Sequence, residues 1–135
     1  MSELTELIGL GVKPEVATII AIDSISNAPT RSVATGLTAA GTTITDALQL
    51  TAFTSILSTV AAATGVKLPP LWPIGQIGFV QNNGANALNI FPPTATIKLN
   101  GGTDGAAVTT AAAAGALIVR LSATDFGVYV LAKEA

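Results

Sequence analysis

The sequence predicts a mainly β protein, a small antiparallel β-sandwich or barrel of about eight short strands. Between residues 64 and 102, short apolar runs are separated by the turn-forming motifs Pro-Pro, Asn-Asn-Gly and Asn-Gly-Gly. The apolar content is aliphatic, because aromatic residues make up only 4% of the chain. Apolar runs recur at intervals of about ten residues, which indicates a sandwich or barrel rather than alternating strands and helices.

The first 28 residues have a different character, since they hold four of the eight acidic residues and a helical apolar pattern. Pro14 suits the first turn of a helix, and Glu15 next to it interacts favourably with the helix dipole. We therefore expect a short amphipathic helix over residues 14–21. The apolar residues that share its face are Val12, Val16, Ile19 and Ile20.

A polar stretch over residues 23–32 contains Pro29 and is typical of a linker. The predicted organisation is an N-terminal segment with its linker over residues 1–32, followed by a β domain over residues 33–135. The N-terminal segment either covers the core of the β domain or docks into another protein, as amphipathic helices do in grooves.

The β domain begins with a Thr-rich region over residues 33–50 that alternates imperfectly, and residues 47–57 also fit one or two helical turns. Further on, Asn82–Gly84 and Asn100–Gly102 tolerate left-handed backbone and predict hairpin turns. Pro92 and Pro93 cannot donate to a central ladder, so the chain leaves the sheet or follows its edge there.

The clearest strands lie at the end of the chain, over residues 116–121 and 127–131. The polar connection between them, residues 122–125, is of hairpin type. Before them, the four alanines that precede Gly115 are too few for a stable helix and are expected to form a turn.

Low charge is the most informative feature of the composition. Only 10% of the residues are charged, against about a quarter in ordinary domains. Such a chain has too little charge to coat a lone monomer, so much of its surface is expected to meet other protein, in a homo-oligomer or a larger particle.

The distribution of charged and apolar residues argues against several partners. The net charge is −2, with no basic stripe that would favour nucleic acid. No uninterrupted apolar segment is long enough to cross a membrane. The acidic start of the chain is unlike a secretory signal, so we expect synthesis in a cytoplasm without export.

The sequence contains few of the residue types that carry out catalysis or bind metals. The chain has no His and no Cys, so imidazole and thiolate catalysis and metal ligation by these groups are absent. Asp46, Asp104 and Asp125 are isolated acids that we expect on solvated turns, and Gly101–Gly105 predicts a tight turn rather than an ion loop. We expect no enzymatic activity, no cofactor and no metal.

Two side chains in the β domain stand out. Trp72, the only tryptophan, lies between Pro70 and Pro73; we expect it to plug the domain or a subunit contact, the alternative being an exposed ring for stacking on sugar. Arg120 interrupts an apolar run, so it points outward or pairs with Asp125 across the turn.

Three motifs together resemble a known family: Thr64–Pro69 (TGVKLP), Val80–Pro92 (VQNNGANALNIFP) and Ile97–Gly102 (IKLNGG). They are similar to a small β domain of tailed-bacteriophage virion proteins associated with capsid decoration or head fibres. The likeness covers roughly the second two thirds of the chain. One departure is Phe126–Tyr129 (FGVY), where related sequences often place a Trp.

The resemblance implies a non-enzymatic structural protein on the capsid surface of a virion. Such proteins are commonly homotrimers whose N-terminal segment attaches to the shell, which makes the major capsid protein the expected partner. A trimer would bury the Ala- and Thr-rich faces of the β domain, where small side chains let subunits approach closely. The residues expected to anchor the chain to the capsid are Leu7, Ile8, Leu10, Val12, Val16, Ile19 and Ile20.

Two other functions fit the sequence less well. A tail-tip or fibre domain that binds a host glycan would use Trp72, Tyr129 and the Asn82–Asn86 loop, the only candidates for ligand contact. A small trimeric β enzyme would have to depend on one of the isolated acids.

Overall fold

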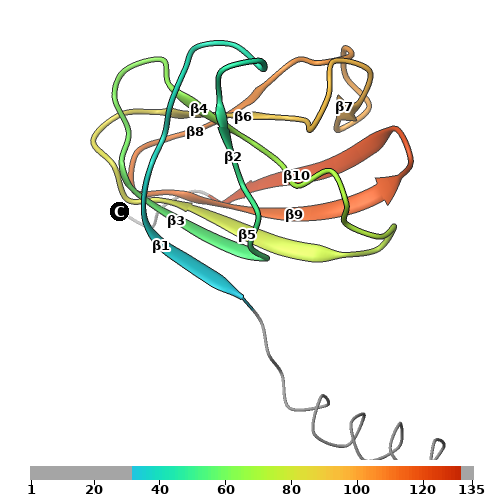
Figure 1. Cartoon of the computed structure of the whole chain (residues 1–135), viewed down its shortest axis with the longest axis horizontal. Helices are drawn as coiled ribbons and strands as arrows, with labels where there is room; N and C mark the ends of the chain where they lie inside the picture. The colour runs from blue at the N-terminus through green and yellow to red at the C-terminus, as the bar shows by residue number, and fades with distance from the viewer. Residues whose placement is uncertain (1–31, 132–135) are drawn as a thin grey trace, which may run out of the picture. The chain divides into compact units, whose positions relative to one another are not determined.

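The computed structural model describes residues 32–131, which contain ten β-strands and no helix (Figure 1). The helix expected over residues 14–21 and the linker before Ser32 lie outside the described residues. The strands form two mixed sheets. The larger sheet has the order β1-β3-β5-β9-β10-β7, and the smaller sheet has the order β2-β4-β6-β8.

The strands have the following bounds in chain order. They are β1 (Val33–Thr38), β2 (Leu48–Gln49), β3 (Thr54–Thr59), β4 (Gly65–Lys67), β5 (Ile77–Asn82), β6 (Leu88–Phe91), β7 (Lys98–Leu99), β8 (Val108–Thr110), β9 (Gly115–Ser122) and β10 (Asp125–Leu131).

The chain winds between the two sheets as a β-solenoid of about four turns. Strands β1, β3 and β5 pair in parallel in the larger sheet, while β2, β4 and β6 pair in parallel in the smaller one. Antiparallel pairing between strands enters with β8, β9 and β10, and one isolated antiparallel bridge joins Ala40 to Gly65. The prediction of an antiparallel sandwich or barrel was therefore wrong.

The error has a physical cause at the turns. A chain reversal closes a hairpin only if the next strand returns to the same sheet, and here successive strands from β1 to β6 cross to the other sheet. Asn82–Gly84 joins β5 to β6, and Asn100–Gly102 follows β7 on the way to β8, so neither turn closes a hairpin. Asn100 and Gly101 nevertheless have the expected left-handed backbone, with φ of 55° and 66°.

In the Asn82–Gly84 turn, the Asn82 side chain connects separate parts of the solenoid through hydrogen bonds. Its side chain is completely buried, and its amide nitrogen donates to the backbone carbonyls of Asn86 (2.8 Å), Ala111 (3.1 Å) and Thr110 (3.3 Å). Its amide oxygen accepts from the Gly84 N–H at 3.0 Å. The residue thus ties a corner of the solenoid to the segment after β8 and satisfies backbone groups that no ladder reaches.

Local predictions were confirmed where the interacting residues are neighbours in sequence. Strands β9 and β10 form the expected hairpin, and Leu88–Phe91 is a strand that ends directly before Pro92. The alanine run before Gly115 is a turn in which Ala113 has a φ of 62°. Residues 47–57 form no helix: they contain β2, the connection that follows it and the start of β3.

The core lies between the sheets and is aliphatic, as expected. Parallel stacking aligns Leu48, Val66 and Ile90, and antiparallel β8 adds Val108 to the same row. In the larger sheet the buried side chains include Leu57, Val80, Ile118, Phe126 and Val128. Such rows of like residues on neighbouring coils bury a continuous apolar surface, which single coils cannot do.

Candidate functional site

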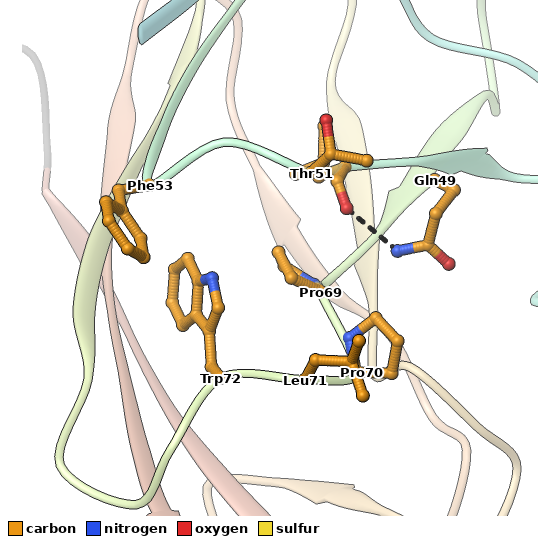
Figure 2. Close-up of a pocket in the computed structure, with 8 residues that line it drawn as sticks. Gln49, Thr51, Phe53, Pro69, Pro70, Leu71 and Trp72 are labelled. Atoms are coloured by element: carbon orange, nitrogen blue, oxygen red, sulfur yellow. Dashed lines mark hydrogen bonds between the residues drawn. The ribbon is translucent and has the colours of Figure 1, made fainter. Parts of the chain in front are cut away.

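An apolar pocket of about 380 Å³ lies where two successive coils cross from the smaller sheet to the larger (Figure 2). The first wall comes from the β2–β3 connection and the second from the β4–β5 connection. No lining residue is charged. The lining residues are Gln49, Leu50, Thr51, Phe53, Pro69, Pro70, Leu71 and Trp72.

Trp72 forms the floor of this pocket and is only 7% exposed. Its ring centroid lies 5.9 Å from that of Phe53 and 6.5 Å from that of Phe126, and both ring pairs are tilted. Beneath the indole, Gly78 has no side chain, and a Cβ there would overlap with the ring. Trp72 is therefore a plug, as expected, and it has no free ring face on which a sugar could stack.

The backbone carbonyls around the pocket are largely engaged by two polar side chains. The amide nitrogen of Gln49 donates to the carbonyls of Leu50 (2.9 Å) and Leu68 (3.1 Å). Nη1 of Arg120 donates to the carbonyls of Pro70 (2.8 Å) and Trp72 (3.1 Å). These bonds fix the Pro-rich loop in place without any ladder pairing.

Arg120 was expected to point outward or to pair with Asp125, and the structure gives it a different set of contacts. Besides the two carbonyls of the Pro-rich loop, it donates to the carbonyls of Ser122 (3.2 Å) and Ala123 (3.1 Å). Its guanidinium carbon lies 5.0 Å from the centre of the Phe126 ring, in the range of a cation–π contact. Arg120 thus neither points into solvent nor pairs with Asp125; it clamps the β4–β5 connection to the β9–β10 turn.

A second feature is the exposed face of the larger sheet, which we call the outer face. Cross-strand pairing places Ile77 beside Val119 and Phe79 beside Leu117, which in turn pairs with Tyr129. The side chains of the outer face on β5, on β9 and on residues 127–131 of β10 are uncharged, and Asp125 at the start of β10 lies at its border. The outer face consists of Ile77, Phe79, Gln81, Leu117, Val119, Leu121, Tyr129 and Leu131.

Two aromatic rings flatten the outer face. A Cβ at Gly127 would lie 2.8 Å from the ring of Tyr129, and one at Gly115 would overlap with the ring of Phe79. Each ring therefore lies down over a glycine instead of standing up from the sheet. The result is a smooth apolar surface of the kind that packs against another protein.

The sequence-predicted site residues are not brought together. Trp72 packs on Gly78 between the sheets, whereas Tyr129 is half exposed on the opposite, outer face. The expected anchoring residues, Leu7 to Ile20, lie outside the described residues. Sequence reasoning missed Gln49 and Phe53 in the pocket, because their proximity to Trp72 depends on the parallel stacking of coils.

The three isolated acids lie in separate loops or strand ends. Asp46 accepts hydrogen bonds from the Thr43 side chain (2.7 Å) and backbone (2.8 Å), which lower the pKa of its carboxyl. Asp125 accepts from the Gly101 N–H at 3.1 Å. Within residues 32–131, no three acidic side chains gather as metal ligands do, and Gly101–Gly105 forms turns.

In the described part of the chain, no helix is long and apolar enough to cross a bilayer. No family model, no curated protein and no solved structure matches this chain.

Proposed function

We propose that the protein is a non-enzymatic structural component of a virion, a capsid decoration or head-fibre subunit. It forms a homotrimer through its β domain and attaches to the major capsid protein through its N-terminal segment. The observation that carries the proposal is the outer face of the larger sheet, which is apolar and flat over β5, β9 and residues 127–131 of β10.

The outer face fits a protein contact better than open solvent. Tyr129, Leu131 and Ile77 are each about half exposed, although their neighbours on the face are also apolar. Contiguous apolar patches of this kind mark sites where a soluble protein meets a partner. The small fraction of charged residues, 10% of the chain, supports the same conclusion, since an assembled subunit needs less charged surface than a monomer.

The solenoid itself suits a structural role. Its backbone is held by strand ladders and by the buried hydrogen bonds of the Asn82 and Arg120 side chains. The sequence resemblance to phage virion proteins adds the capsid as the place of assembly. Glycan binding receives no comparable support, because the Trp72 ring is sandwiched rather than presented.

The first test concerns the trimer. Light scattering of the full-length protein should give the mass of three chains, and Leu117→Lys combined with Tyr129→Lys should reduce it to one chain. Ile74→Lys is the control, because Ile74 is 66% exposed but lies in a connection rather than on the outer face. A monomeric native protein, or a trimer that survives both outer-face charges, would overturn the proposed interface.

The second test concerns the capsid. Full-length protein should co-sediment with undecorated capsids, and Ile19→Asp combined with Ile20→Asp should abolish this while leaving the trimer mass unchanged. If the variant still co-sediments, the N-terminal segment is not the anchor. If the native trimer itself does not co-sediment, the capsid role is wrong even though the trimer stands.

A further inference from the structure

Two Asn-Gly dipeptides occur in the chain, Asn83–Gly84 and Asn100–Gly101. Asparagine is a chemically labile residue, and a following glycine favours loss of its side-chain amide, because glycine leaves the next backbone nitrogen unhindered and free to rotate. The dipeptides are identical in sequence, so sequence alone makes them equally labile. The structure gives them different surroundings.

The reaction requires the asparagine side chain and the next backbone nitrogen to move together. The glycine nitrogen attacks Cγ of the asparagine, its proton passes to hydroxide or another solvent base, and the side-chain amide leaves as ammonia. Water then opens the resulting succinimide at either carbonyl, which gives aspartate or isoaspartate. A side chain held by hydrogen bonds does not reach the attacking geometry until those bonds break.

Asn100 is held at each group that takes part in this reaction. Its Nδ2 donates to the Val128 carbonyl at 3.0 Å, and its Oδ1 accepts from the Val128 N–H at 2.7 Å. The attacking nitrogen, that of Gly101, donates to Oδ1 of Asp125 at 3.1 Å. The Asn100 side chain therefore pairs with β10 much as a neighbouring strand would, and the reaction would have to break this pairing.

Asn83 is held far less. Its side chain is exposed, its Oδ1 accepts one surface hydrogen bond from Nε2 of Gln81 at 3.0 Å, and its Nδ2 donates to none of the described residues. The attacking nitrogen, that of Gly84, donates to Oδ1 of Asn82 at 3.0 Å. The departing amide of Asn83 is thus open to water, and one part-buried hydrogen bond restrains the nucleophile.

Packing accounts for the glycine at position 84. A Cβ on Gly84 would lie 2.6 Å from Cβ of Val60, which real Cβ atoms do not approach so closely. Position 83 makes no matching demand for asparagine, because Asn83 is exposed and does not have left-handed backbone. The fold therefore keeps the nucleophile at Gly84 unhindered for a reason that is independent of Asn83.

We propose that Asn83 is a site of spontaneous deamidation in the folded protein and that Asn100 is protected. Each event replaces a neutral amide by a carboxylate next to Gln81 of the outer face. Formation of isoaspartate also lengthens the main chain at a corner of the solenoid, where the Asn83 N–H donates to the Leu57 carbonyl at 2.8 Å. This proposal does not depend on the virion role or on the trimer.

Trypsin separates the two sites for a direct test, because cleavage after Lys67, Lys98 and Arg120 places Asn83 in peptide 68–98 and Asn100 in peptide 99–120. The full-length protein is incubated at mildly alkaline pH, either folded in buffer or unfolded in concentrated guanidinium chloride. Isoaspartyl methyltransferase measures isoaspartate in each peptide, and fragmentation in the mass spectrometer locates the change from amide to acid.

In the unfolded protein, we expect the two peptides to gain isoaspartate at similar rates. In the folded protein, Asn83 should react at least about tenfold faster than Asn100, since the two hydrogen bonds to Val128 must break only at Asn100. Similar rates at the two sites of the folded protein overturn the proposal. So does a folded protein in which Asn83 does not react while the unfolded protein reacts at both sites.

Asn83→Ala is the matched variant, because it removes an exposed side chain and keeps Gly84 and Asn82 in place. It should abolish isoaspartate in peptide 68–98 of the folded protein. In the unfolded variant, peptide 99–120 should react as it does in the unfolded native protein. Isoaspartate that persists in peptide 68–98 of the folded variant would assign the reaction to another asparagine of that peptide and overturn the proposal. None of these outcomes bears on the capsid and trimer tests, which have separate readouts.

Discussion

The indole ring of Trp72 occupies the space that a side chain at Gly78 would fill. A Cβ built on Gly78 would overlap both with the edge of the indole and with the backbone carbonyl of Phe53. Gly78 lies in β5, in the row that pairs with Ile118 of β9. The position of the tryptophan between the sheets therefore depends on the absence of a side chain in the middle of a strand.

Gly78→Ala should destabilise the protein by about 2–3 kcal/mol, because the added methyl group forces apart a packed ring and a backbone carbonyl. Urea unfolding followed by the fluorescence of Trp72 measures the change. Gly102→Ala is the comparison, since its Cβ would meet nothing closer than the Leu99 carbonyl at 3.1 Å. Equal stability of Gly78→Ala and the native protein would show that the ring has room to move.

Arg120→Lys should lower the free energy of unfolding by about 2 kcal/mol. A lysine ammonium cannot span the four carbonyls that the guanidinium reaches, and it loses the planar contact with Phe126. The indole signal of Trp72 should also shift, because the Pro70 and Trp72 carbonyls lose their donor. The measurement is urea unfolding together with the ¹⁵N–¹H spectrum.

The control for Arg120 is Lys98→Ala, a change at another cationic residue that is exposed on β7. We expect it to stay within about 0.5 kcal/mol of the native protein. If Arg120→Lys behaves like this control, the side-chain contacts of Arg120 contribute little to stability, and the Pro-rich loop is held by packing and by its other hydrogen bonds, such as those from Gln49 and Gly75.

The sequence predicted features set by near neighbours. The β9–β10 hairpin, the end of β6 at Pro92 and the left-handed turn at Asn100 and Gly101 depend on residues within a few positions of one another. Turn propensity, alternation and proline chemistry act at this range. The aliphatic core and the buried position of Trp72 were predicted on a different basis, from the residue types alone.

The sheet pairing was not predicted, because a turn motif does not specify which sheet receives the next strand. Thr54 pairs in parallel with Phe79 only after the chain has passed through β4 in the other sheet. The pocket has the same origin: Phe53 meets Trp72 because two coils stack, and nothing in the spacing of these residues shows it. The outer face likewise required the register that aligns Leu117 with Phe79 and Tyr129.

Asn82→Leu should be among the most destabilising single changes, at about 3 kcal/mol. Leucine has a similar volume but leaves the Gly84 N–H and the carbonyls of Asn86 and Ala111 without their buried partner. Thermal or urea unfolding measures the loss. Asn83→Ala is the control, because Asn83 is exposed and its side chain accepts only a surface hydrogen bond from Gln81; if both variants cost the same, burial of the Asn82 amide is not the cause.

The carboxyl of Asp46 should titrate below its ordinary value of 3.8, because the side chain and backbone of Thr43 donate hydrogen bonds to its charged form. A pKa that is lower in the folded state than in the unfolded state stabilises the fold above the unfolded value. That contribution is lost as the pH falls through the lowered folded pKa. Because the Asp46 carboxyl is solvent-exposed, its effect on stability is small. The pKa itself is therefore the quantity to measure, by ¹³C NMR of the carboxyl.

Thr43→Val removes the hydroxyl donor and keeps the backbone N–H, so the pKa of Asp46 should rise partway toward its ordinary value. Thr45→Val is the matched control, because Thr45 lies in the same loop and its side chain makes no hydrogen bond to the Asp46 carboxyl. An Asp46 titration that is the same in both variants would mean that the hydroxyl of Thr43 does not stabilise the charged carboxylate. The backbone N–H would then be left as the donor that organises the loop between β1 and β2.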